Sequence, residues 1–138
     1  GRSRHRVVEL RSGQRFVGQY DPQESRIWKA TIAEFAATAM QGEPPLAGAV
    51  TLEVVFVFLP PASFPKWRAK LLSDGVEIPK VTRPDLKNLM AAIEDGGNGI
   101  LWRDDGQVFS YGYSRKVYGL RAEVLVTAVE TATWRTER

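Results

Sequence analysis

The longest apolar run of the chain lies at residues 49–59, where Val, Leu and Phe dominate. One set of alternate positions in this run is entirely apolar, and Val55 and Val57 make the other face largely apolar too. β-Branched and aromatic side chains favour a strand, and a strand that is apolar on both faces is typical of the centre of a sheet. We therefore predict a central strand here, ended by Pro60-Pro61.

Apolar residues at helical spacing predict a first helix after Asp21-Pro22. Asp is a good N-cap, Pro suits the first helical position, and Glu24 completes a capping box. Gly42 and Pro44-Pro45 end the pattern. The helix is expected to pack one face against the sheet. Its apolar positions are Trp28, Ile32, Phe35, Ala36 and Ala39.

A second helix is predicted to start at Asp85, which is its expected N-cap. The glycine-rich segment 96–99 is expected to end it. The apolar stripe between these two points consists of Leu86, Leu89, Met90 and Ile93.

The remaining segments predict short strands and one ambiguous stretch. Residues 6–10 and 15–20 are expected to form a hairpin around Ser12-Gly13, and residues 108–118 to pair antiparallel with residues 120–129. Residues 64–72 are expected to form a short helix or an ordered loop. The fold class is thus α+β, a small mixed α/β sheet with two main helices packed on it. One domain is expected over residues 1–138, with a basic, mobile N-terminal segment at 1–14 and a polar tail at 131–138.

Length and composition indicate an ordinary soluble domain. The chain has 138 residues, 43% of them hydrophobic and 25% charged, as globular proteins do. Its lack of cysteine excludes disulfides and thiolate metal sites. No apolar run approaches the roughly 20 residues of a membrane span. We therefore expect a soluble, cytoplasmic protein with no membrane partner.

The charge is distributed unevenly along the chain. The net charge is +3, yet the window from residue 85 to residue 105 carries −3, so the remainder carries +6. Carboxylates bind hard divalent cations, and a basic surface attracts the phosphate backbone of nucleic acids. The pattern favours a metal-dependent nuclease. The acids of the window are Asp85, Glu94, Asp95, Asp104 and Asp105.

The spacing of these acids limits which of them can share an ion. Asp85 at a helix start and Asp104-Asp105 before a strand can meet, because the glycine-rich loop lets the chain return. Asp95 lies ten residues beyond Asp85, about 15 Å along a helix. It is expected to be a helix-end or dimer-contact residue, since metal–oxygen distances are about 2.0–2.6 Å. Taken singly, Asp85 can be only an N-cap and Asp105-Gly106 only a tight turn.

Other chemistries find no support in the sequence. His5 is the only histidine, and no nucleophilic triad or zinc-ligand spacing is present. The glycine-rich loop at 96–99 lacks the Lys and Ser or Thr that a nucleotide-binding loop needs, so we expect no nucleotide cofactor.

Two basic groups are candidates for DNA contacts. One surrounds Trp67, whose ring either stacks on a base or packs down into the protein; both readings remain open. The other flanks the acidic window. The predicted DNA-binding residues are Lys66, Arg68, Lys70, Lys80, Arg83, Arg115 and Lys116.

The order of the acidic window resembles the RusA family of Holliday junction resolvases, endonucleases often carried by prophages. The matching residues are Pro84, Asp85, Asn88, Leu89, Asp95, Trp102, Asp104, Asp105, Gln107 and Val108. Tyr20-Asp21-Pro22 and the segment Lys116-Val117-Tyr118-Gly119 are also similar. The resemblance covers most of residues 15–128.

This resemblance implies a homodimer that binds four-way DNA junctions in recombination and repair. It would nick two strands symmetrically with Mg²⁺ or Mn²⁺. By motif position Asp85 and Asp105 would be metal ligands and catalytic residues, with Asp104 alongside. The metal would activate a water for attack on the scissile phosphate.

Two positions depart from the family pattern: Lys87 replaces the second Asp, and Ala91 replaces a lysine. Unit charges 4 Å apart interact by about 4 kcal/mol at an effective dielectric near 20, so an ammonium here weakens metal binding. Three explanations remain open. The chain is an inactive form that still binds branched DNA, or Glu94 or Asp104 supplies the missing ligand, or Lys87 takes the catalytic role of the family lysine.

Overall fold

The structure of the chain, a computed structural model, describes residues 5–12 and 22–131, with side chains from Trp28 onward. Its described strands form one sheet of six, in the order β1-β6-β2-β5-β3, and β4 pairs with β2 beside β5. The strands are β1 (His5–Ser12), β2 (Ala49–Phe58), β3 (Ile78–Pro79), β4 (Val108–Tyr111), β5 (Arg115–Tyr118) and β6 (Glu123–Thr131). β2 has partners on both edges, which confirms the predicted central strand.

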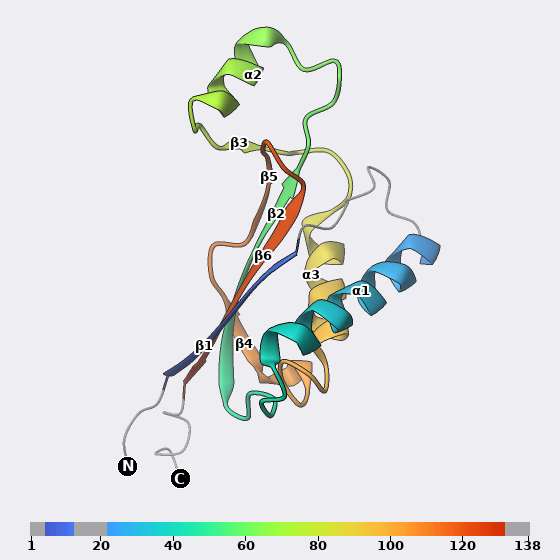
Figure 1. The fold of residues 1–138 in the computed structure, drawn as a ribbon, viewed down its shortest axis with the longest axis vertical. Coiled ribbons are helices and arrows are strands. Elements are labelled where there is room, and N and C mark those ends of the chain that lie inside the picture. The colour runs from blue at the N-terminus through green and yellow to red at the C-terminus, as the bar shows by residue number, and fades with distance from the viewer. Residues whose placement is uncertain (1–4, 13–21, 132–138) are drawn as a thin grey trace.

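Two helices, α1 (Pro22–Met40) and α3 (Leu86–Gly97), cover one face of this sheet (Figure 1). Alternate residues of β2 and β6 point toward these helices and are buried with them in one core. The α+β class and the two main helices are thus confirmed. The side chains at the centre of the core are Trp102, Phe56, Leu46, Leu52, Ile93, Leu101, Val50, Val54 and Val126.

The opposite face of the sheet is only half-buried in the described part of the chain. Thr51, Glu53 and Val55 of β2 lie on this face, beside Leu125 and Thr127 of β6. The prediction that both faces of β2 are buried therefore holds only at its end, where Val57 is buried. Over the rest of β2, only the face that packs against the helices is buried from solvent.

The helices begin and end close to where the sequence predicts. The apolar stripe of α3 is buried, apart from the half-buried Leu86 at its start. In α1, Ile32 and Ala36 are buried, while Trp28 and Phe35 pack against the core. The proposed cap Asp21 and the second strand of the hairpin, residues 15–20, lie outside the described residues. The backbone of β1 pairs with β6.

The prediction for residues 108–129 was wrong in two respects. Residues 108–118 form two short strands, β4 and β5, separated by residues 112–114, and both pair parallel with β2. The following strand, β6, pairs antiparallel with β2 and β1 and has no pairing with β4 or β5. The physical reason is that β2, apolar on both faces, takes the central place and separates strands that follow one another in sequence.

The segment between β2 and α3 projects beyond the end of the sheet (Figure 1). We call residues 59–82 the arm. It carries the helix α2 (Lys66–Ser73), which settles the open choice between helix and loop, and the short strand β3. β3 pairs antiparallel with β5, so the base of the arm is part of the sheet.

None of the helices in the described ranges is long and apolar enough to cross a membrane. The domain limits at 1–14 and 131–138 stay predictions.

Candidate nuclease site

Asp85 starts α3, as predicted, but its side chain does not cap the helix. It occupies the N-cap position with an extended backbone and makes no side-chain hydrogen bond there. The residue is exposed, and its backbone oxygen accepts the first helical bond from Leu89 at 3.2 Å. The carboxylate is therefore available for another partner.

Lys116 of β5 fixes the chain that leads into Asp85. Its Nζ donates to the carbonyl oxygens of Thr82 and Pro84, both at 2.7 Å. A half-buried ammonium that binds two carbonyls holds the backbone of a turn more firmly than water does. The residue that the sequence suggested for DNA contact thus also positions Asp85.

The surroundings of Lys116 lower the pKa of its ammonium. Burial is the largest cause, and the nearby charge of Lys80 adds to it, while the charge of Asp85 acts in the opposite direction. Asp85 therefore lies near enough to Lys116 for an electrostatic interaction. The start of α3 thus brings an acid and two cations together.

Asp104 and Gln107 form a closed capping arrangement around η1, a 3-10 turn at Asp105–Gln107. An oxygen of Asp104 accepts from the backbone N–H of Gly106 at 3.0 Å. The side chain of Gln107 accepts from the backbone of Arg103 and Asp104, and donates to two carbonyls before β2. One oxygen of Asp104 is thus occupied in holding the turn that presents Asp105.

Asp105 is half-exposed and lies beside α3, because η1 packs against that helix. Glu94 of α3 accepts a short hydrogen bond from the hydroxyl of Tyr111 in β4. This bond is the main cause that raises the pKa of Tyr111 to about 12, with further contributions from burial and from the charges of Glu94 and Asp105. Asp105, Glu94 and Tyr111 are therefore close neighbours.

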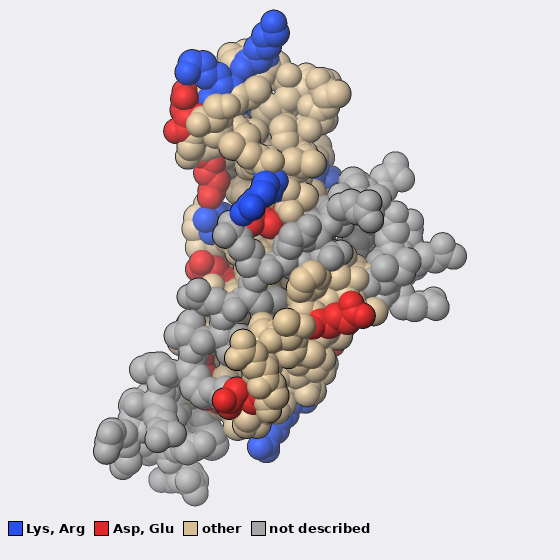
Figure 2. Space-filling model, viewed as in Figure 1, with Lys and Arg blue, Asp and Glu red and all other residues tan. Residues whose placement is uncertain are grey.

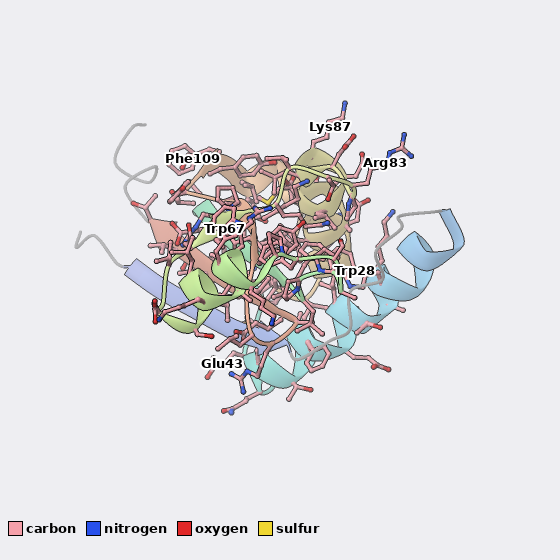
Figure 3. All side chains as sticks on the ribbon, turned by 90° about the horizontal axis from the view of Figure 1, so that it is seen from above. Trp28, Glu43, Trp67, Arg83, Lys87 and Phe109 are labelled. Carbon is pink, nitrogen blue, oxygen red and sulfur yellow. The ribbon has the colours of Figure 1, made fainter. Side chains whose placement is uncertain are left out.

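The structure thus places Asp85 at the start of α3 and Asp105 beside Glu94, which lies nine residues, or about 14 Å, farther along the helix axis. No group of three metal-ligating side chains is found within residues 28–131, the part with described side chains. Lys87, at the position of the missing Asp, is exposed in the first turn of α3 and points away from the protein (Figure 3). The oxygen ligands present are those a hard cation prefers, but their number is small.

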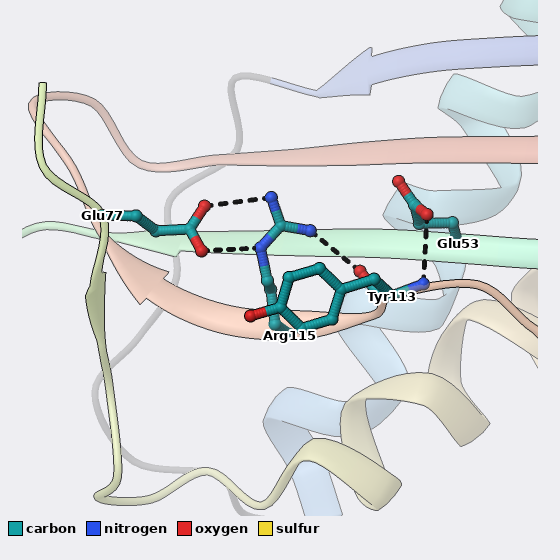
Figure 4. A network of polar contacts seen from close by, with 4 residues as sticks. All are labelled: Glu53, Glu77, Tyr113 and Arg115. Atoms are coloured by element: carbon teal, nitrogen blue, oxygen red, sulfur yellow. Dashed lines mark hydrogen bonds and ion pairs between the residues drawn. The ribbon is translucent and has the colours of Figure 1, made fainter.

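Arg115 is half-buried, and three hydrogen bonds hold its guanidinium in place (Figure 4). Its Nε and Nη2 donate to Glu77 at 2.9 Å each, and its Nη1 donates to the carbonyl of Tyr113 at 2.8 Å. The bond to Glu77 is the main cause that raises the pKa of Arg115. The backbone N–H of Tyr113 donates to Glu53, so the base of the arm is tied to β5 and β2.

The other predicted cations differ in how far they reach solvent. Figure 2 shows Lys and Arg side chains gathered on the arm over α2. Lys66 is exposed, and Lys70 forms a largely exposed ion pair with Asp74 at 3.1 Å. Arg83 is exposed beside α3, whereas Lys80 donates to the hydroxyl of Thr82. Exposed charges of this kind suit contacts to phosphates.

The sequence did not single out Tyr111 as part of the site. Its position in an alternating strand suggested only packing, and the contact with Glu94 depends on how β4 lies against α3. Asp95 was expected at a helix end, and it forms an ion pair with Lys29 of α1 at 3.1 Å. It therefore joins the two main helices.

Comparison with known proteins identifies the family. The family model of the endodeoxyribonuclease RusA matches residues 1–128. The chain belongs to the RusA family. The match covers all described elements except the last residues of β6, and it confirms the resemblance carried by the acidic window. RusA proteins are Holliday junction resolvases, so the family is one of nucleases that act on DNA. No curated protein matches the sequence individually.

Proposed function

We propose that this RusA protein is a metal-dependent endonuclease that resolves four-way DNA junctions by paired, symmetric nicks. The observation that carries the proposal is the uncapped, exposed carboxylate of Asp85 on a turn that Lys116 holds in place. A helix-start Asp that only stabilised the helix would bind the free N–H groups of the first turn. This one leaves its oxygens to a ligand.

Asp85 and Asp105 are the residues that would hold Mg²⁺ or Mn²⁺. Neither side chain has a hydrogen-bond partner among the described residues, and both present hard oxygen ligands. Mg²⁺ is commonly bound by one or two carboxylates together with substrate phosphates, so DNA would complete the set. When bound, the metal supplies a water of lowered pKa and stabilises charge on the phosphate.

The protein's own residues prepare this site. Lys116 fixes the turn before Asp85, and the bonds of Asp104 and Gln107 fix the turn that carries Asp105. Lys87 follows Asp85 by two residues, and its exposed ammonium would offset part of the negative charge of the site and attract a phosphate. The side chain would then position DNA and take over part of the role of the family lysine.

Contacts to the DNA backbone are proposed for the cations that the sequence singled out. Lys66, Arg68 and Lys70 offer charge on the arm, and Lys80 and Arg83 lie between the arm and Asp85. Arg115 and Lys116 would act by holding the arm and the turn before α3. A homodimer would present two such sites, which matches the two-fold symmetry of a four-way junction.

A second function, binding of branched DNA without cleavage, is favoured by Lys87 itself. An ammonium in place of a ligand carboxylate removes one negative charge and adds one positive charge. At an effective dielectric near 20 such a charge costs about 4 kcal/mol at 4 Å from a cation. If this effect prevails, the site binds a phosphate where relatives would bind a metal.

A nicking assay on synthetic four-way junctions separates the two functions. The nuclease proposal predicts cleavage with Mg²⁺ or Mn²⁺, faster in Lys87→Asp and at least 100-fold slower in Asp105→Asn. Linear duplex of the same sequence is the control substrate. Junction binding without cleavage by the unchanged protein or by Lys87→Asp would favour the second function. Equal affinity for junction and duplex would contradict both.

A further inference from the structure

Trp67 lies on the outer surface of the arm, with 66% of its area exposed. Trp102 in the core is fully buried, and Trp28 packs against the core. Tryptophan is the largest apolar side chain, so an exposed ring at the tip of a projecting element usually serves an interaction. Of the two readings that the sequence left open, the one in which Trp67 packs down into the protein is excluded by this exposure.

The charge around Trp67 is positive. α2 contains Lys66, Arg68 and Lys70 within its eight residues, and it contains no acid. The guanidinium of Arg68 lies 4.4 Å from the centre of the Phe64 ring and 6.0 Å from that of Trp67. The ring is therefore bordered by cations, one of which is held in place by aromatic contacts.

The arm is anchored well enough to present this ring in a fixed direction. Phe64 packs on Tyr118 of β5 with ring centres 5.0 Å apart, and Leu72 of α2 is buried. The ion pair of Glu77 with Arg115 ties the base of the arm to the sheet. α2 thus uses its inner side for packing and leaves Trp67 outside. Figure 3 shows Trp67 and Lys87 in separate parts of the molecule.

We propose that Trp67 stacks on a base left unstacked at the branch point of branched DNA, while the cations of α2 contact the neighbouring phosphates. This second DNA contact is distinct from the Asp85 site and rests on the proposed function, in which branched DNA is the substrate. Four-way junctions expose bases at the branch point, where stacking is interrupted. Aromatic rings bind such bases without regard to sequence, and cations beside them follow the backbone.

Nucleic acid fits this surface better than it fits the other exposed aromatics. Phe109, Tyr111 and Tyr113 are more than half exposed on and after β4. Tyr113 lies near Glu53, and Tyr111 lies near Glu94 and Asp105, whose charges repel phosphates. In the described part of the chain, Trp67 combines a large exposed ring with a net positive charge, because the three cations of α2 outnumber Asp74, which pairs with Lys70.

The test measures binding in Ca²⁺, separately from cleavage, by the unchanged protein and by Trp67→Ala, Trp67→Leu and Trp67→Phe. The probes are a four-way junction with 2-aminopurine at the branch point, a single strand and a linear duplex. Stacking predicts that Trp67→Ala weakens junction and single-strand binding roughly 5- to 100-fold and duplex binding less than twofold. It also predicts that the unchanged protein quenches the fluorescence of the 2-aminopurine at the branch point. Trp67→Phe should stay within about threefold of the unchanged protein.

Trp67→Leu is the matched control, because it keeps apolar bulk without a π-face. Binding by Trp67→Leu equal to the unchanged protein overturns the proposal, as does an equal loss on all three probes. Trp67-dependent sedimentation with anionic lipid vesicles, or Trp67-dependent dimerisation, without any change in DNA binding, also overturns it. Thermal melting of each variant should be unchanged, since the ring is exposed. A Trp67 effect on binding without junction cleavage by any variant would refute the nuclease proposal but support this one.

Discussion

At the scale of single residues, the site depends on side chains that are not used for local structure. Asp85 occupies the N-cap position of α3, but its side chain makes no capping hydrogen bond. The side chain of Asp104, in contrast, caps η1. The sequence motif contains both acids and does not distinguish them. Both acids are exposed, and the structure separates one without a capping bond from one that holds a turn.

The pair of Glu94 and Tyr111 allows a direct test of geometry. The hydrogen bond and charge of Glu94 raise the pKa of Tyr111 to about 12, so Glu94→Gln should lower that pKa toward 10. Ultraviolet absorbance of tyrosinate, compared with Tyr111→Phe to assign the signal, measures it. An unchanged titration in Glu94→Gln would show that the two side chains do not meet in solution.

The same pair makes stability depend on alkaline pH. The pKa of Tyr111 is raised in the folded state. The contribution of its hydroxyl to the free energy of unfolding is therefore complete below pH 10 and is lost as the pH rises from 10 to about 12. Because the residue is more than half exposed, we expect about 1 kcal/mol or less. Denaturant unfolding at pH 9 and pH 11.5 should therefore show a larger loss in the unchanged protein than in Tyr111→Phe.

Lys116 should matter for folding as well as for DNA. Lys116→Met removes two hydrogen bonds from an ammonium to carbonyls, which predicts a loss of about 1–3 kcal/mol in the free energy of unfolding. Urea unfolding measures the loss, with Lys66→Met as the exposed control, for which little change is expected. Equal effects of both substitutions would contradict the positioning role.

At the scale of elements, α1 and α3 approach closely at Gly96. A Cβ there would lie 2.8 Å from Cγ2 of Ile32 and 3.1 Å from the carbonyl oxygen of Lys29. Gly96→Ala gains about 1 kcal/mol in helix propensity but forces the helices apart. We expect a net loss of about 1–2 kcal/mol in thermal or urea unfolding. Stabilisation by Gly96→Ala would show that the two helices pack more loosely than described.

The elements also show what sequence patterns can predict. The apolar periodicity of α1, α3 and β2 is local and strong, and it predicts these elements correctly. The pairing of β6 with β2, instead of with its neighbour in sequence, depends on competition among all strands for the central place. The break at residues 112–114 separates β4, which pairs with residues 50–52 of β2, from β5, which pairs with residues 55–58 on the same edge.

The sequence motif predicts which residues form the candidate site, but not the contacts that position them. The motif names Asp85 and Asp105, but spacing alone cannot show that Lys116 holds the turn before α3. It also cannot show that Arg115 is paired with Glu77. These contacts join residues more than 30 positions apart and exist only once the sheet has formed.

At the scale of the whole molecule, DNA affinity should depend on salt through the exposed cations. Each phosphate contact contributes about 0.9 to the slope of the logarithm of affinity against the logarithm of salt concentration. Lys66→Ala should reduce that slope by about this amount in junction binding. The double substitution Glu77→Gln with Arg115→Gln removes the pair that ties the arm at constant net charge, so it should lower the affinity by loosening the arm but leave the slope unchanged. The reverse pattern would assign the DNA contact to Arg115.

The most direct measurement is a crystal structure of the protein with Mn²⁺, in which anomalous scattering locates the ion. The proposal predicts one peak coordinated by oxygens of Asp85 and Asp105 at about 2.0–2.3 Å, with higher occupancy in Lys87→Asp. A peak elsewhere, or carboxyl groups of Asp85 and Asp105 more than about 8 Å apart in both proteins with no ion between them, would contradict it.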